Sequence, residues 1–191
     1  MRSEQSLQQF VIFDTALGFF GLGWSPQGLT RVILPERSRD AVARRLAGTQ
    51  AREARGDAPL PPFVAEAISL IRRYAQGEKV DFSPLPLDLE AAGTFDRAIY
   101  AAALQLGFGE VTTYGALAEE AGFEKIMARE TGAALGRNPL PLVVPCHRIL
   151  AAGGKIGGFS APGGAATKQR MLAHEGVRLG PAEPAQSSFT F

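Results

Sequence analysis

Short apolar runs alternate with turns at the start of the chain. Residues 10–12 and 31–34 are rich in β-forming side chains. Three glycines and a Ser-Pro-Gln-Gly turn at residues 25–28 separate these two runs. Apolar runs of this length, bounded by turn residues, predict an antiparallel meander.

Two helices and a further strand are predicted next. The first helix is capped by Ser38 or Asp40 and ends near Leu46, and the second runs from a proline pair over residues 61–77. Residues 80–87 predict a strand that leads into a linker. We expect the boundary between two domains at about residue 90.

Beyond this boundary the apolar positions recur with the helical period. Helices are predicted over residues 94–106, 114–121 and 124–135, and a last helix ends at residues 174–176. The glycine turn between the second and third of them outlines a helix-turn-helix. By itself this outline is weak evidence for DNA binding, because most packed helical hairpins bind no DNA.

These elements together predict an α+β fold with two domains. Residues 1–90 are expected to form an α/β domain and residues 91–179 a mainly helical domain. Residues 180–191 are rich in Pro, Ser and Gln and are expected to be a disordered tail.

Composition narrows the class of protein. The 191 residues are 46% hydrophobic and 20% charged, which excludes a mainly disordered chain. A net charge of +1 provides no global field toward nucleic acid or membrane, and a single cysteine excludes an internal disulfide. Near the start there is neither a bilayer-spanning apolar run nor a signal-peptide pattern, so a soluble, cytoplasmic protein is expected.

Two pairs of adjacent residues carry candidate chemistry. Cys146 precedes His147, and His174 precedes Glu175. A thiol attacks as thiolate, so a base or a positive partner must lower its pKa near neutrality. His147 can supply the base and Glu175 can orient it, as in other nucleophile–base–acid relays. The residues alone favour a structural interpretation, in which Cys146 is a small buried hydrophobe and His174 caps a helix end.

The sequence around these pairs resembles a known family. Residues 136–149 read GRNPLPLVVPCHRI and residues 172–176 read LAHEG. With Tyr114-Gly115 at a helix start and Ala128-Arg129 upstream of Gly132, they resemble the active-site signature of the O6-alkylguanine-DNA alkyltransferases. The resemblance covers residues 95–177. The first half of the chain fits the family's small ribonuclease H-like α/β domain in outline only.

The resemblance implies a role for each catalytic residue. Cys146 would accept the alkyl group, and His147 would deprotonate it through a bridging water. Glu175 would support His147, and Asn138 would brace the turn that holds the cysteine. Tyr114 would donate its phenol proton toward the departing guanine.

The resemblance also implies residues that contact DNA and the base. Arg129 corresponds to the arginine finger that fills the gap left by the flipped nucleotide. The other implied DNA-binding residues are Tyr114, Gly115, Ala128 and Gly132. The implied substrate pocket comprises Pro141, Ile149, Phe159 and Ser160.

The implied function is DNA repair by a single-turnover, self-inactivating methyltransferase. Its partner would be double-stranded DNA containing O6-alkylguanine, with O4-alkylthymine left open as a second lesion. A damaged pair flips out at lower cost than an intact one. We expect no cofactor, no metal and no membrane partner, and a monomer. Residues 94–179 carry a net charge of 9 − 7 = +2, which favours weak, salt-sensitive DNA binding.

Three other classes of protein fit the sequence less well. A protein that binds alkylated bases without transfer would lack the cysteine, which is present here. A helix-turn-helix regulator would need side chains that reach base edges, whereas Ala128, Ala133 and Ala134 suit close packing. A cysteine hydrolase would give no reason for the segment from Tyr114 to Arg129.

Overall fold

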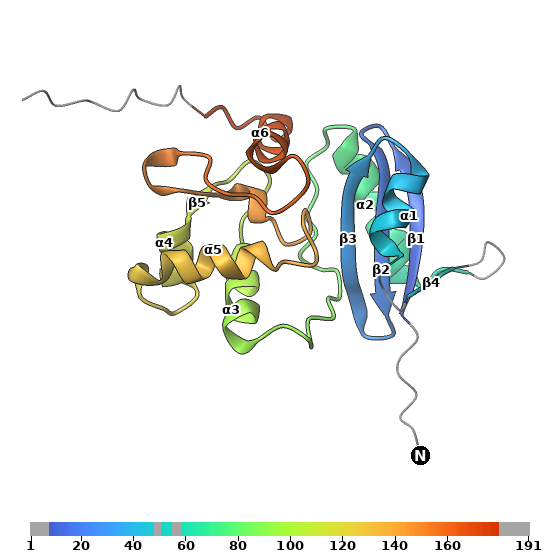
Figure 1. The fold of residues 1–191 in the computed structure, drawn as a ribbon, viewed down its shortest axis with the longest axis horizontal. Coiled ribbons are helices and arrows are strands. Elements are labelled where there is room, and N and C mark those ends of the chain that lie inside the picture. The colour runs from blue at the N-terminus through green and yellow to red at the C-terminus, as the bar shows by residue number, and fades with distance from the viewer. Residues whose placement is uncertain (1–7, 48–50, 55–58, 180–191) are drawn as a thin grey trace, which may run out of the picture.

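A four-stranded sheet forms the first part of the molecule (Figure 1). The computed structural model describes residues 8–47, 51–54 and 59–179. The strands are β1 (Gln9–Thr15), β2 (Gly18–Ser25), β3 (Gly28–Glu36) and β4 (Arg52–Glu53). The first three pair antiparallel in chain order, and β4 joins the edge of β1 in parallel. The predicted meander is therefore confirmed.

The glycine-rich segment that separates the two predicted runs is itself a strand, β2, which lies inside the sheet between β1 and β3. In β2, Gly21 faces α1 (Arg39–Leu46), and a Cβ atom there would lie 2.7 Å from Cγ1 of Val42. Glycine thus lets the helix approach the sheet closely. The helix begins where predicted, since Oγ of Ser38 accepts a hydrogen bond from the Ala41 amide at 3.2 Å.

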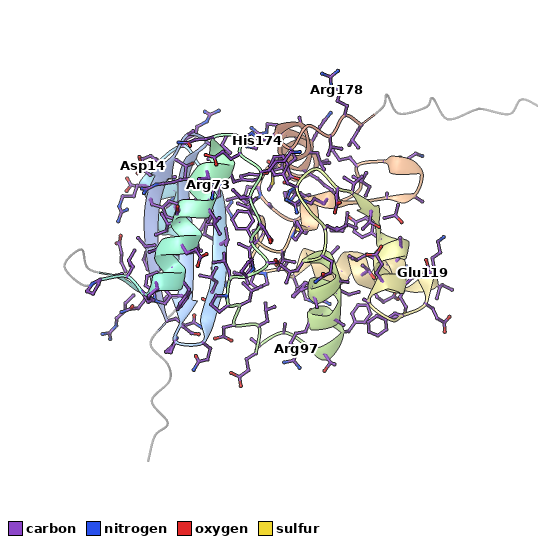
Figure 2. All side chains as sticks on the ribbon, turned by 180° about the vertical axis from the view of Figure 1, so that it is seen from behind. Asp14, Arg73, Arg97, Glu119, His174 and Arg178 are labelled. Atoms are coloured by element: carbon purple, nitrogen blue, oxygen red, sulfur yellow. The ribbon has the colours of Figure 1, made fainter. Side chains whose placement is uncertain are left out.

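Helices cover both faces of the sheet, because neighbouring strand residues point to opposite sides. Ile12 packs with Val42 and Leu46 of α1, whereas Phe13 belongs to the main core with α2 (Pro62–Ala75). Figure 1 shows α1 in front of the sheet, and Figure 2, seen from behind, shows α2 on the other face.

The prediction of a strand over residues 80–87 is wrong. This segment runs as turns and coil, and only Leu87 pairs with the sheet, through one bridge to Leu29. Pro84 and Pro86 lack amide protons and cannot donate to a ladder. The carbonyl of Pro86 still accepts the Leu29 amide at 2.8 Å, which anchors the connection along β3.

The rest of the chain is mainly helical, as predicted. Its helices and strands are α3 (Thr94–Ala103), β5 (Thr112–Thr113), α4 (Tyr114–Glu120), α5 (Ala128–Gly136), β6 (Ile149–Leu150) and α6 (Gly164–His174). Three short 3₁₀ turns are η1 (Lys125–Met127), η2 (Cys146–Arg148) and η3 (Ala152–Gly154). No helix in the described ranges is long and apolar enough to cross a membrane.

Two predicted helix boundaries were wrong. The helix expected over residues 94–106 ends at Ala103, where the chain tightens into 3₁₀-type turns. The helix expected over residues 124–135 is divided into η1 and α5, and Met127 is both the last residue of η1 and the N-cap of α5. Helix ends commonly change to the tighter 3₁₀ pattern, which apolar periodicity does not reveal.

A small parallel pairing positions the functional region. Thr112 and Thr113 of β5 pair with Ile149 and Leu150 of β6. Thr113 also caps α4, with its hydroxyl accepting the Ala116 amide at 3.3 Å. The pairing therefore places the start of α4 beside the segment that directly follows Cys146.

Candidate active site

Cys146 lies at the end of a loop that is stabilised by two hydrogen bonds of the Asn138 side chain. Nδ2 of Asn138 donates to the Val144 carbonyl at 3.0 Å, and its Oδ1 accepts the Leu140 amide at 2.9 Å. Inside this loop Leu142 adopts a φ of +79°, which is strained for a residue with a side chain. Asn138 therefore stabilises the turn that presents Cys146.

Burial has the largest effect on the pKa of the Cys146 thiol. Cys146 is only 6% exposed, and burial raises the pKa of its thiol. A hydrogen bond from Asn138 and the positive charge of Lys168 lower the pKa, but they do not outweigh burial. The expectation of a depressed thiol pKa was therefore wrong, because removal from water disfavours the thiolate. Attack requires that a neighbouring base removes the thiol proton.

His147 follows Cys146 in the chain and is hydrogen-bonded to Glu175. Its Nε2 lies 2.6 Å from Oε1 of Glu175, and neither side chain is exposed. Burial lowers the pKa of His147 in spite of Glu175, which favours the neutral imidazole. With a proton on Nε2, Nδ1 is the free lone pair, and it is buried without a partner among the described residues.

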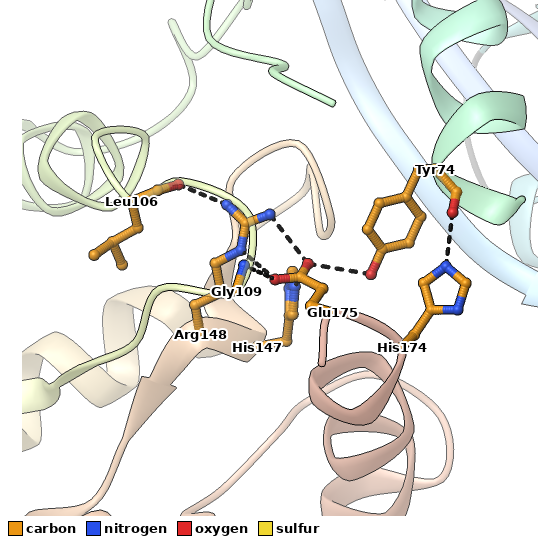
Figure 3. Close-up of polar contacts among 7 residues, drawn as sticks. All are labelled: Tyr74, Leu106, Gly109, His147, Arg148, His174 and Glu175. Carbon is orange, nitrogen blue, oxygen red and sulfur yellow. Dashed lines mark hydrogen bonds and ion pairs between the residues drawn. The ribbon is translucent and has the colours of Figure 1, made fainter. Parts of the chain in front are cut away.

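Glu175 is the centre of a buried polar network (Figure 3). Arg148 donates to both of its oxygens, from Nε at 2.8 Å and from Nη2 at 3.0 Å. The Gly109 amide donates to Oε2 at 2.9 Å, and the Tyr74 hydroxyl to Oε1 at 3.2 Å. Burial would raise the pKa of Glu175, but hydrogen bonds from His147 and Arg148 and the charge of Arg148 lower it to about 2.

A buried lysine that the sequence analysis missed lies beside Tyr114. Nζ of Lys168 donates to the Tyr114 hydroxyl at 3.3 Å and to the Gly158 carbonyl at 3.2 Å. It also donates to the Ile149 carbonyl, and burial lowers its pKa to about 8. One signal was available, since Lys168, Leu172 and Glu175 have the spacing of a single helix face.

Two cavities reach Cys146. One of about 240 Å³ lies under α5, and its lining includes Tyr114, Gly132, Phe159 and Ser160. The other, of about 250 Å³, lies toward β3, and its lining includes Asn138, Pro141, Phe159 and Ser160. The predicted pocket residue Ile149 lines neither cavity. It is completely buried, and its carbonyl is bound to Lys168.

The residues predicted to contact DNA lie on or between α4 and α5. Arg129 is exposed in the first turn of α5, outside both cavities. Ala128 begins that helix, and Gly132 lies one turn later, against the Tyr114 ring. Gly115 is buried, and a Cβ there would come within 2.9 Å of Lys125, so it permits close packing of α4 on η1.

A buried cysteine, a neutral histidine and a carboxylate next to an open cavity are typical of proteins with a cysteine nucleophile. A family model described as "6-O-methylguanine DNA methyltransferase, DNA binding domain" matches residues 94–177. The human methylated-DNA–protein-cysteine methyltransferase is 34% identical over 171 residues, which cover 87% of this chain and 80% of the human protein. The protein of that name from Methanothermobacter thermautotrophicus is 31% identical over 159 residues, which cover 83% and 80%.

Solved structures agree with these relatives. The Mycobacterium tuberculosis O6-methylguanine methyltransferase superposes with a TM-score of 0.68 at 26% identity, covering 93% of this chain and 97% of that one. Its structure in complex with DNA has the same TM-score at 28% identity, covering 87% and 92%. The chain belongs to the methylated-DNA–protein-cysteine methyltransferase family. The family resemblance and the α+β fold expected from the sequence are both confirmed.

Proposed function

We propose that this protein repairs DNA by moving the alkyl group of O6-alkylguanine onto Sγ of Cys146. The observation that carries the proposal is the buried Cys146-His147 pair with Glu175 hydrogen-bonded behind it, beside a cavity large enough for a base. O4-alkylthymine is a second lesion of the same chemistry. The product is a thioether, so each molecule acts once.

Proton transfer starts the reaction. Nδ1 of His147 takes the thiol proton, directly or through a water, and Glu175 stabilises the imidazolium that forms. A new bond joins Sγ to the alkyl carbon while the bond between that carbon and O6 breaks. Because the thiol has a raised pKa in its buried site, the thiolate is generated only when the base acts.

Tyr114 supplies the proton that lets guanine leave without a charge. Its hydroxyl lies at the cavity beside Cys146 and is within 3.3 Å of Nζ of Lys168. A phenolate formed there would be stabilised by the lysine charge. Phe159 and Ser160 border the same cavity and are suited to contact the base edge.

A nucleobase of duplex DNA reaches this cavity only after it leaves the base stack. We propose that α4 and α5 lie against the duplex and that Arg129, exposed at the start of α5, fills the gap left by the flipped nucleotide. Ala128 and Gly132 are small and allow the duplex to approach closely, whereas the buried Gly115 would act by keeping α4 packed on η1. Binding of this kind reads the phosphate backbone more than the sequence.

We also propose that the protein works as a monomer in the cytoplasm. The cysteine, the relay and both cavities come from one chain. A nucleophilic thiol must remain reduced, which fits a reducing compartment. Sedimentation of the protein with and without a short duplex tests the monomer, and cell fractionation tests the compartment.

The test of the function is the intact mass after incubation with a duplex that holds one O6-methylguanine. Wild type should gain the mass of one methyl group in place of one hydrogen, and peptide mapping should place it on Cys146. Cys146→Ser should gain nothing while it still binds the duplex, because a hydroxyl is a far weaker nucleophile. Transfer by the serine variant, or methylation elsewhere in wild type, would refute the proposal.

A further inference from the structure

A tyrosine from the first part of the chain reaches the relay. Tyr74 lies in the last turn of α2, 101 residues before Glu175, and its hydroxyl donates to Oε1 of that carboxylate at 3.2 Å. The same oxygen lies 2.6 Å from Nε2 of His147. Figure 3 shows the tyrosine and the histidine on two sides of one carboxylate.

The position of this hydroxyl is set by packing around the ring. Tyr74 is 2% exposed, and its ring centroid lies 6.2 Å from that of Phe82 and 6.0 Å from that of Phe108. The His174 ring packs against it at 4.9 Å, and Nε2 of His174 lies 2.6 Å from the Tyr74 carbonyl. The main chain and the ring are both held, so the hydroxyl has little freedom.

The ionisable groups that are hydrogen-bonded to Glu175 come from two elements. His147 and Arg148 are on η2, and Tyr74 is on α2. His174 is next to Glu175 in sequence, but its imidazole nitrogen is directed to the Tyr74 carbonyl. Among the described residues, Tyr74 is therefore the uncharged side chain that donates to the oxygen shared with His147.

We propose that Tyr74 is a positioning residue for alkyl transfer: its hydroxyl orients the Glu175 carboxylate and limits the negative charge that this carboxylate presents to His147. The proposal rests on the proposed function, in which His147 takes the thiol proton. Through Tyr74, the sheet-containing first part of the chain would influence alkyl transfer by way of Glu175.

Removal of the Tyr74 hydroxyl should raise the pKa of His147. Without its hydrogen bond, more negative charge remains on Oε1, and this charge favours the protonated form of His147. More of the histidine is then protonated at low pH, where it cannot accept the thiol proton. The acid limb of the rate profile should move to higher pH, by about half a unit to one unit, since a hydrogen bond changes a pKa by about that amount.

The experiment compares Tyr74→Phe with Tyr100→Phe. Tyr100 is 1% exposed, and its hydroxyl donates to the Ala134 carbonyl at 2.8 Å, so each variant removes one buried hydroxyl and keeps the ring. Single-turnover transfer from duplex O6-methylguanine is measured by intact mass across the pH range. On the acid limb Tyr74→Phe should be about 3- to 10-fold slower than wild type, and at high pH within about 2-fold. Tyr100→Phe should keep the wild-type midpoint.

A second measurement does not depend on turnover. The chain has two histidines, so their side-chain NMR signals can be followed separately during titration. The midpoint of His147 should rise in Tyr74→Phe and stay unchanged in Tyr100→Phe. Identical midpoints in the two variants, by rate and by NMR, would overturn the role of Tyr74 while wild type still transfers. Absence of transfer in wild type would instead refute the proposed function.

Discussion

Glu175→Gln is the perturbation with the largest expected effect on the fold. The substitution keeps the shape of the side chain but removes the charge that Arg148 and His147 bind. Arg148 is only 4% exposed, so its guanidinium would remain buried without a counter-charge. Loss of one partner of a buried ion pair costs about 3–5 kcal/mol.

The pKa shift of Glu175 gives a similar magnitude. Its pKa is lowered from 4.5 to about 2 in the folded protein, and the side chain is completely buried. A difference of this size corresponds to about 3 kcal/mol of folding free energy. Because the folded pKa is depressed, this stabilisation is present above pH 4.5 and is lost as the pH falls toward 2. About 2 kcal/mol of it should be gone at pH 3.

The assay is urea unfolding of wild type and Glu175→Gln at pH 7 and pH 3. The difference between the two proteins should be about 3 kcal/mol at pH 7 and about 2 kcal/mol smaller at pH 3. Glu78→Gln is the matched control, since it removes a carboxylate paired with Arg73 at 2.8 Å, where both side chains are about half exposed. The control should change stability by less than about 1 kcal/mol. A loss below about 1 kcal/mol in Glu175→Gln, or one of equal size at both pH values, would refute the reasoning.

Two further substitutions test the effect of Lys168 on the thiol and the proposed role of Arg129 in filling the gap left by the flipped nucleotide. Lys168→Met removes a charge that lowers the pKa of Cys146, so single-turnover transfer should slow about 10-fold at neutral pH and recover partly at higher pH; an unchanged pH profile would contradict this role. Arg129→Ala should slow repair of duplex DNA much more than reaction with free O6-alkylguanine base, because the free base has no stack to leave. Equal slowing of the two reactions in rate assays would exclude this role of Arg129.

The sequence by itself determined the class of fold, the family and the starts of α1 to α4. Strand and helix periods depend on neighbouring residues, so the meander, the Ser38 cap and the start of α2 at its proline pair could be predicted. Cys146 and His147 are adjacent in sequence, and the motif around them indicated Glu175 as their partner. Local rules failed where tertiary contacts decide. The glycine-rich β2 is an inner strand of the sheet, where Gly21 lets α1 pack closely against it.

Only the tertiary structure decided how the site is surrounded. Gly109 and Tyr74 donate to Glu175 from 66 and 101 residues away, and no periodic pattern encodes such separations. Lys168 resembles a surface lysine in the sequence, yet the fold buries it against the Ile149 and Gly158 carbonyls. The thiol pKa is raised for the same reason, since burial depends on what the whole chain packs around a group. Residue types specify which chemistry is available, whereas packing specifies the dielectric and the partners that control it.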